Sequence, residues 1–219
     1  PVRYRGFDNK LYTEAAVDSM VAARNQKMEA AQTDIRFRRQ ITGSQTRGDT
    51  LIHSFKLRGA PKAVFDNEAR YAPLIGRPLP AFALPDVQGR LVRSEELRGR
   101  PLVINLWFTA CPPCVAEMPE LNRLQQENQG VAFLGMTFDP PEKVNAFLQK
   151  QAFTWRQIPA ARAYCEQFTQ QYPLSVFVDK QGIIRQILGG IPLRYDAVAK
   201  QITKEVDSSE FQAALRSIQ

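Results

Sequence analysis

Two cysteines separated by two prolines are the feature that most limits how this chain folds. Cys111-Pro-Pro-Cys114 follows the apolar run 102–108 and opens the helical pattern 112–127. In the first turn of a helix, two intervening residues bring a pair of cysteine sulfurs within reach of a disulfide bond. Cys111 would then lie at the helix N-terminus, where free amides and the helix dipole favour a thiolate. The pattern predicts a reactive Cys111 and a less exposed Cys114 that resolves a mixed disulfide.

Other uses of two cysteines need partners that are scarce in this sequence. The chain has three cysteines and one histidine, so a zinc ribbon would lack its second pair of cysteines. A structural disulfide or half of a metal site remains the competing interpretation of the pair. The third cysteine, Cys165, follows Ala161 and Tyr164 at helical spacing and precedes Phe168. That spacing predicts a small buried core residue rather than a redox thiol.

Strand and helix patterns alternate through most of the chain, which indicates an α/β layer architecture. Expected strands are 102–108, 131–137, 154–158, 174–179 and 183–188, and expected helices are 112–127, 142–151, 161–168, 195–204 and 209–218. The short turn Lys180-Gln-Gly182 joins the last two strands and predicts an antiparallel edge. Upstream, two short strands are expected to flank the turn 86–89, and Ser94 is expected to cap a short helix.

The first 70 residues have a different pattern. A helical stripe over 13–30 precedes two alternating segments, 34–41 and 51–57, on either side of the turn-rich stretch 42–48. His53 shares a strand face with Leu51, Phe55 and Leu57, which predicts a structural role for it. Residues 60–75 read as a linker. We therefore expect a helix plus β-hairpin extension over 1–70, of unassigned function, and a second domain over 71–219.

The charge balance is basic, with a net charge of +7 that is concentrated before residue 77. A basic surface is compatible with nucleic-acid binding. No basic helix interleaved with aromatic residues and no zinc spacing supports that function, so a solvated basic face is expected and no nucleic-acid partner. No apolar run approaches the roughly 18 residues of a membrane-spanning helix, so we expect no transmembrane segment in this chain.

Three separated segments carry a resemblance to a known family. The segment 107–121, Trp-Phe-Thr-Ala-Cys-Pro-Pro-Cys-Val-Ala-Glu-Met-Pro-Glu-Leu, resembles the active-site segment of the TlpA/ResA-like branch of the thioredoxin superfamily. The segments 75–84 and 172–182 resemble that branch's opening segment and its cis-proline segment. The resemblance covers about residues 75–205. It implies a thioredoxin-like three-layer fold with a mixed central sheet flanked by helices. The implied activity is that of a protein-disulfide oxidoreductase, with no cofactor besides the redox-active Cys111–Cys114 disulfide.

The resemblance also implies roles for individual residues. Cys111 matches the nucleophile and Cys114 matches the resolving thiol. Trp107 matches the aromatic residue that packs beside the site. Pro173 matches the proline whose preceding peptide bond is cis, which only proline tolerates readily. That bond would leave the backbone of Tyr172 free to pair with a bound substrate strand.

Glu117, three residues after Cys114, matches a glutamate near the thiols in ResA-like proteins. A partly buried carboxylate there would have a raised pKa and could move protons for Cys114. A solvated helix face is the competing interpretation. Thioredoxin itself has an aspartate six residues before its first cysteine, where this chain has Asn105. An amide cannot accept that proton, so proton transfer would fall to Glu117 or water.

The two prolines between the cysteines affect the expected direction of the reaction. Neither Pro112 nor Pro113 has a backbone N–H, which leaves the Cys114 amide as the main donor to the Cys111 sulfur. Fewer donors stabilise the thiolate less and make the disulfide less oxidising. We therefore expect a reductant, with a Cys111 pKa nearer thioredoxin's value of roughly 7 than the roughly 3.5 of a strong oxidant.

Partners and location follow from the resemblance. Protein substrates with disulfides or dithiols are implied, together with a membrane-bound electron donor and an extracytoplasmic location in the periplasm or cell envelope of a bacterium. Because the chain opens with Pro-Val-Arg and not Met, we expect its targeting segment to have been removed.

Two alternative functions stay open. One is a thiol peroxidase, since Thr109 precedes Cys111, although the spacing is one residue short of the peroxidase arrangement. The other is a non-catalytic module that binds copper or another partner. The absence of any histidine after Cys114 counts against copper.

Overall fold

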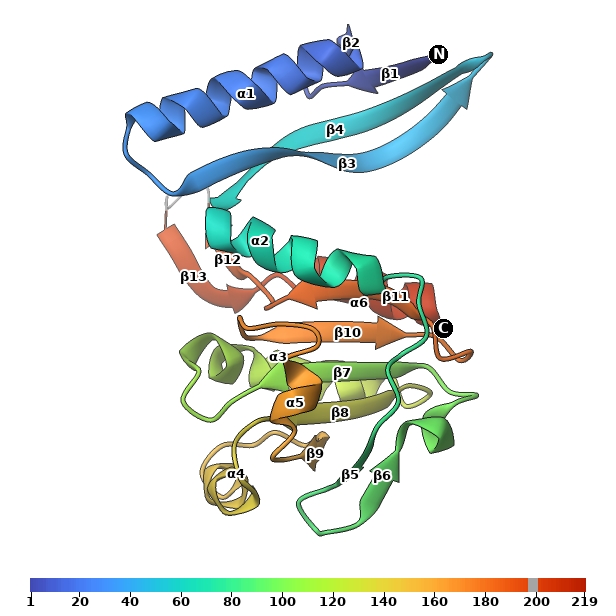
Figure 1. Cartoon of the computed structure of the whole chain (residues 1–219), viewed down its shortest axis with the longest axis vertical. Helices are drawn as coiled ribbons and strands as arrows, with labels where there is room; N and C mark the ends of the chain where they lie inside the picture. Colours follow the sequence, from blue (N-terminus) through green and yellow to red (C-terminus); the bar gives the residue numbers. More distant parts are fainter. Residues whose placement is uncertain (197–200) are drawn as a thin grey trace. The chain divides into compact units, whose positions relative to one another are not determined.

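The computed structural model describes residues 1–196 and 201–219, with side chains described for 1–192 and 206–219. The chain forms two compact units, Pro1–Glu68 and Ala69–Gln219. Figure 1 shows the elements of both, coloured along the sequence. Each unit is described by itself below.

The N-terminal unit is a four-stranded sheet with one long helix. Its strands are β1 (Val2–Arg5), β2 (Leu11–Tyr12), β3 (Ile35–Arg47) and β4 (Thr50–Pro61), in the order β2-β1-β4-β3. Helix α1 (Glu14–Ala30) starts at Thr13, whose Oγ1 accepts a hydrogen bond from the Ala16 amide. Val17 of α1 packs against Tyr4 and Phe55 of the sheet and forms a small core. The helix and hairpin patterns thus correspond to α1 and β3–β4, whereas β1 and β2 were too short to predict.

Two expectations for this region are wrong. Residues 42–48 were expected to form a turn, but β3 runs to Arg47 with a register shift between Ile41 and Gly43. Such a bulge lets a strand absorb residues that resemble a turn. Residues 60–75 were expected to form a linker, but helix α2 (Lys62–Tyr71) and the 3-10 turn η1 (Ala72–Leu74) occupy them. Pro61 is the last residue of β4, and α2 begins at the next residue. Proline ends the strand here but does not prevent a helix from starting directly after it, because its missing N–H is not needed there.

The second unit is built on a five-stranded mixed sheet. Its strands are β7 (Leu102–Trp107), β8 (Ala132–Thr137), β9 (Arg156–Ile158), β10 (Leu174–Val178) and β11 (Ile184–Gly189), in the order β11-β10-β7-β8-β9. Strands β7, β8 and β9 are parallel, while β10 is antiparallel to both β7 and β11. Every residue of the central strand β7 is buried, as expected for a strand covered on both faces.

Helices cover both faces of this sheet and complete the expected three layers. Leu102, Ile104 and Leu106 of β7 pack into one core, which includes Tyr164 and Cys165 of helix α5 (Arg162–Cys165). Alternate β7 residues pack into a second core with helices α3 (Pro112–Glu127), α4 (Pro141–Leu148) and α6 (Ser209–Ile218). The period-two alternation along β7 is what separates the two cores.

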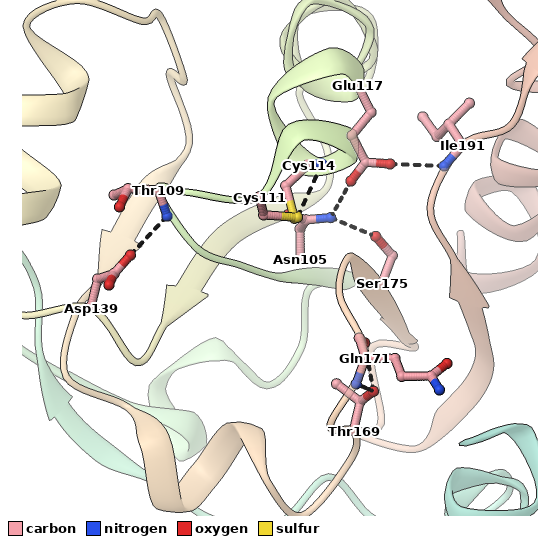
Figure 2. The surroundings of a disulfide bond; sticks show 10 residues. All are labelled: Asn105, Thr109, Cys111, Cys114, Glu117, Asp139, Thr169, Gln171, Ser175 and Ile191. Atoms are coloured by element: carbon pink, nitrogen blue, oxygen red, sulfur yellow. Dashed lines mark hydrogen bonds between the residues drawn. A yellow bond between two sulfur atoms is a disulfide. The ribbon is translucent and has the colours of Figure 1, made fainter. Parts of the chain in front are cut away.

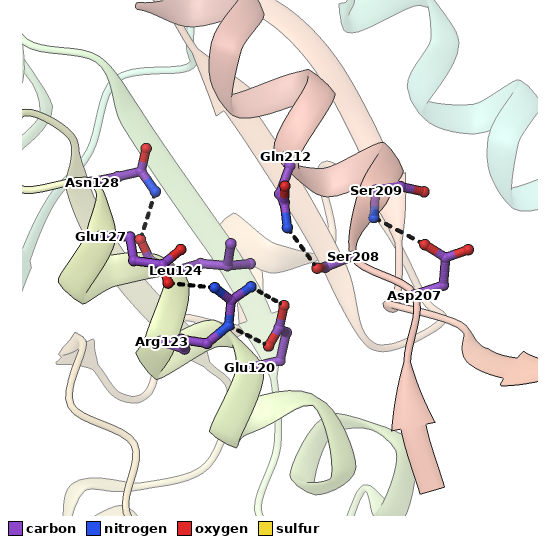
Figure 3. Close-up of polar contacts among 9 residues, drawn as sticks. All are labelled: Glu120, Arg123, Leu124, Glu127, Asn128, Asp207, Ser208, Ser209 and Gln212. Atoms are coloured by element: carbon purple, nitrogen blue, oxygen red, sulfur yellow. Dashed lines mark hydrogen bonds and ion pairs between the residues drawn. The ribbon is translucent and has the colours of Figure 1, made fainter. Parts of the chain in front are cut away.

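Helix α6 packs beside α3 and supports the helix that begins at the cysteine pair. Phe211, Ala214, Leu215 and Ile218 form the buried stripe of α6 and belong to the same core as Leu121 of α3. Figure 3 shows the polar groups near this contact. Arg123 bridges Glu120 and Glu127 on α3, and the Ser208 hydroxyl accepts from Gln212 on α6 at 3.0 Å.

Two smaller features in this unit differ from expectation. Strands β5 (Ala83–Pro85) and β6 (Leu91–Arg93) pair as predicted, but Arg93 is the cap residue of the 3-10 turn η2 (Ser94–Leu97), and the Ser94 hydroxyl accepts from the Phe82 amide instead. The helix predicted over 195–204 is also wrong. Strands β12 (Leu193–Asp196) and β13 (Gln201–Val206) pair there, and 197–200 lies outside the described residues. In the sequence, Val198 and Ile202 are four residues apart, a spacing that fits both a helix and a strand.

Candidate active site

The cysteine pair lies at the start of α3 and is joined by a disulfide bond. Cys111 is the N-cap residue of the helix, and its Sγ accepts a hydrogen bond from the Cys114 amide at 3.3 Å (Figure 2). Pro112 and Pro113 occupy the first two helical positions, where a missing N–H removes no helical hydrogen bond. The amide predicted to be the main donor to Cys111 is therefore the one that donates.

Burial of the two cysteines differs from expectation. Only 2% of Cys111 and 1% of Cys114 is exposed, so the first cysteine is not clearly more accessible than the second. Both belong to the core that α3 forms with the sheet. A partner must dock closely against this surface to reach the Cys111 sulfur.

Trp107 packs beside the site, as the resemblance implies. Its side chain is fully buried in the same core as the two cysteines and contacts the rings of Phe147 and Phe153. The indole Nε1–H donates to Gln157 Oε1 at 2.9 Å, which satisfies its buried donor. Gln157 reaches this position because it lies over Gly135 of the neighbouring strand, where a Cβ atom would stand 2.8 Å from Gln157 Cδ.

This packing gives a stability prediction. Gly135→Ala is expected to lower the unfolding free energy of the oxidised protein by about 1–3 kcal/mol, because the added methyl displaces Gln157 and leaves the Trp107 N–H unpaired. Gly130→Ala is the matched control, since a Cβ there meets nothing within 4 Å. Denaturant unfolding monitored by tryptophan fluorescence measures both variants. Equal stabilities would show that Gln157 has room to move.

Glu117 is buried, not on a solvated helix face. Only 2% of the residue is exposed, and its carboxylate is held from two sides. Asn105 Nδ2 on β7 donates to Oε1 at 3.0 Å, and the backbone N–H of Ile191 donates to Oε2 at 2.8 Å (Figure 2). Asn105 Nδ2 also donates to the Ser175 hydroxyl at 3.1 Å. The residue that replaces the thioredoxin aspartate is therefore a hydrogen-bond donor to the glutamate.

The environment of Glu117 changes its acidity. Burial raises its pKa from the ordinary 4.5 to about 7, and the hydrogen bonds from Ile191 and Asn105 oppose that rise. A carboxyl group with a pKa near 7 can both accept and release a proton at neutral pH. Among the described residues, the groups that stabilise the charged form are the neutral donors Ile191 N–H and Asn105 Nδ2.

The Tyr172–Pro173 peptide bond is cis, as the resemblance implies. It directly precedes β10, which pairs with β7, the strand that leads to Cys111. In the described part of the chain, the backbone of Tyr172 has no hydrogen-bond partner. The Tyr172 ring packs edge-on against Phe108 and Phe138, and burial raises its pKa to about 12.

Sequence reasoning missed the group that holds the loop before Cys111. The carboxylate of Asp139, after β8, accepts from the Thr109 backbone N–H at 2.7 Å and from Lys143 Nζ at 2.7 Å. Burial opposes ionisation of Asp139, but these donors hold its pKa below its ordinary value. Asp139 stands 28 residues from Cys111 in the sequence, and no local motif marks it. Asp139 follows β8, which is parallel to β7, and this position could have indicated that its side chain lies near the loop before Cys111.

The third cysteine is a core residue. Cys165 is free and fully buried, and burial raises its pKa to about 12, so its thiol stays protonated at neutral pH. This confirms the structural prediction. Across the described residues, no group of three or more His, Cys, Asp or Glu side chains is arranged to hold a metal ion.

Comparison with known proteins identifies the family. Residues 75–187 match the model of the AhpC/TSA family. The chain is 36% identical over 124 residues to the thiol:disulfide interchange protein DsbE of Pseudomonas aeruginosa, across 54% of this chain and 68% of that protein. It is 31% identical over 130 residues to the thiol-disulfide oxidoreductase ResA of Geobacillus thermodenitrificans, across 56% of this chain and 73% of ResA.

Solved structures show the same fold. A thiol:disulfide interchange protein of the thioredoxin family from Chlorobium tepidum superposes with a TM-score of 0.52 at 20% identity, over 64% of this chain and 94% of that protein. DsbF of MTB superposes with a TM-score of 0.51 at 20% identity, over 63% of this chain and 95% of that protein. Together with the Cys111–Cys114 disulfide at the start of α3, these matches place the chain in the AhpC/TSA family, as a thiol–disulfide oxidoreductase of the TlpA/ResA-like thioredoxin branch.

Proposed function

We propose that this oxidoreductase reduces disulfides of protein partners, with Cys111 as nucleophile and Cys114 as resolving thiol. The observation that carries the proposed direction is the start of α3, where Pro112 and Pro113 contribute no amide and the Cys114 N–H donates to the Cys111 sulfur. A sparsely stabilised thiolate favours oxidation of the pair over its reduction.

The proposed reaction transfers two electrons from the protein dithiol to a substrate disulfide. The Cys111 thiolate attacks one substrate sulfur and forms a mixed disulfide, while the other substrate sulfur leaves as a thiolate and takes a proton. Glu117 then accepts the proton of Cys114, whose thiolate attacks the Cys111 sulfur. The Cys111–Cys114 disulfide forms, and the second substrate sulfur leaves as a thiolate that takes the proton from Glu117 or water.

The remaining shell residues are proposed to bind and shape the substrate site. Pro173 would present the backbone of Tyr172 to an extended substrate segment, which would add main-chain hydrogen bonds. Trp107 would pack beside the cysteines and keep the shape of the substrate site. We assign the chemistry to the unit Ala69–Gln219 and no role to the unit Pro1–Glu68.

Location and electron supply extend the proposal. The resemblance to the TlpA/ResA-like branch supports an extracytoplasmic location in a bacterial cell envelope. It also supports a membrane-bound electron donor. Within the described residues, no helix combines the length and apolar character needed to cross a bilayer.

The acidity of Cys111 tests the proposed direction. The ultraviolet absorbance of the thiolate in the reduced protein is expected to rise with an inflection near pH 7, as in thioredoxin. Equilibration with glutathione should give a reduction potential closer to thioredoxin's roughly −270 mV than to the roughly −120 mV of a strong oxidant. An inflection below about pH 5 would contradict a reductant. Consumption of hydrogen peroxide by the reduced protein would instead favour the thiol peroxidase alternative.

A further inference from the structure

The carboxylate of Glu117 is held by a segment that belongs neither to α3 nor to the cis-proline loop. Ile191 lies two residues after the end of β11, and its backbone N–H donates to Glu117 Oε2 at 2.8 Å. The two residues are 74 positions apart in the sequence. Figure 2 shows Ile191 and Asn105 approaching the carboxylate from different elements.

Gly190 is what allows this approach. A Cβ atom on Gly190 would stand 2.7 Å from Pro173 Cγ and 3.3 Å from Glu117 Oε2, the oxygen that Ile191 binds. A Cβ atom on the adjacent Gly189 would meet nothing within 4 Å. Neither glycine has a positive φ, so the requirement at position 190 is for space and not for an unusual backbone conformation.

We propose that Gly190 and Ile191 are positioning residues of the disulfide-exchange reaction: the bare backbone at Gly190 lets the Ile191 N–H hold the Glu117 carboxylate where it can exchange a proton with Cys114. This inference rests on the proposed role of Glu117 as proton carrier.

The physical basis is the balance of burial and hydrogen bonding. Burial favours the neutral acid, and each hydrogen bond to the carboxylate favours the charged form. Among the described residues, the donors to the Glu117 carboxylate are the Asn105 amide from β7 and the Ile191 N–H, and neither titrates. Cys111 and Cys114 lie at the start of the same helix, where their disulfide does not titrate in the oxidised protein. Without the Ile191 donor, Glu117 would be protonated in a larger fraction of the molecules at neutral pH, so fewer of them could accept the Cys114 proton.

The test compares two neighbouring substitutions in the full-length protein. Infrared difference spectroscopy of the oxidised protein follows the carboxyl band of Glu117, which Glu117→Gln identifies by removing it. The intensity of this band is followed against pH, and its inflection gives the pKa of Glu117. Gly190→Ala is expected to raise that pKa by about one unit, because the added methyl separates the Ile191 N–H from the carboxylate. Gly189→Ala should titrate like the wild type. Exchange activity at pH 7 is expected to fall about fivefold in Gly190→Ala, because the ionised fraction of Glu117 falls by that factor. In a Glu117→Gln background, the Gly190→Ala and Gly189→Ala substitutions should give the same pH profile.

The outcomes separate this inference from the proposed role of Glu117. A wild-type carboxyl titration in a folded Gly190→Ala protein would overturn the inference. A shifted titration with an unchanged pH–rate profile would support the positioning by Ile191 and overturn the role of Glu117 in proton transfer. If Gly190→Ala does not fold, an ester in place of the Ile191 amide removes the donor without adding atoms. An unshifted titration in the ester variant would likewise overturn the inference.

Discussion

Replacing Cys111 with alanine is expected to reduce the rate of insulin disulfide reduction at pH 7 by at least about 1,000-fold, to the level of the uncatalysed reaction. Cys111 is the N-cap residue of α3, where the helix N-terminus stabilises a thiolate. Cys114 is not expected to replace it, because only the Cys111 sulfur occupies the N-cap position, where it accepts the hydrogen bond from the Cys114 amide. Thioredoxin-type turbidity assays with dithiothreitol as electron source measure the rate.

The complementary variant, Cys114→Ala, should accumulate the mixed disulfide that Cys111 forms with its substrate, since the resolving thiol is gone. Non-reducing electrophoresis and mass spectrometry then identify the partner. Cys165→Ala is the matched control, because it also removes one thiol but from a fully buried core position. It should show neither loss of rate nor trapping. Disulfide exchange that persists in Cys111→Ala would contradict the assignment of the nucleophile. A mixed disulfide on Cys114 in the same variant would contradict it as well.

Glu117→Gln is expected to change how the stability of the oxidised protein depends on pH. The folded-state pKa of about 7 lies above the ordinary 4.5, so the folded state holds a proton that the unfolded state has already lost. The unfolding free energy of the wild type should therefore fall as pH rises from about 4.5 to about 7. The fall amounts to about 3 kcal/mol. The Gln variant should lack this fall, which denaturant unfolding at pH 5 and pH 8 measures.

The same variant should also lose about 100-fold in exchange rate near pH 7, because water replaces a positioned proton carrier. Its pH–rate profile should lack the inflection near 7 that Glu117 contributes. Glu127→Gln is the matched control, being the same substitution on the same helix, at an exposed glutamate paired with Arg123. A wild-type pH–rate profile in Glu117→Gln would show that water carries the proton.

Much of the second unit could be predicted because its signals are local. The apolar run of β7, the alternation of strands with helices and the Gly turn before β11 each depend on residues close in sequence. The prediction over 195–204 was wrong because its apolar spacing satisfied two periods at once. The linker predicted over 60–75 was wrong because the end of β4 at Pro61 was taken as the start of an irregular segment, although α2 begins at the next residue.

The sequence by itself determined the redox pair: two cysteines at helix spacing, after a buried strand and with prolines between them, specify their own geometry through the backbone of a single turn. Only the tertiary structure decided what surrounds that pair. Glu117 is buried because α3 packs against β7, and its two donors come from 12 and 74 residues away. Hydrogen bonds over such separations depend on which strands become neighbours in the sheet and on where the chain has room, as at Gly190. Local residue patterns carry no record of those contacts.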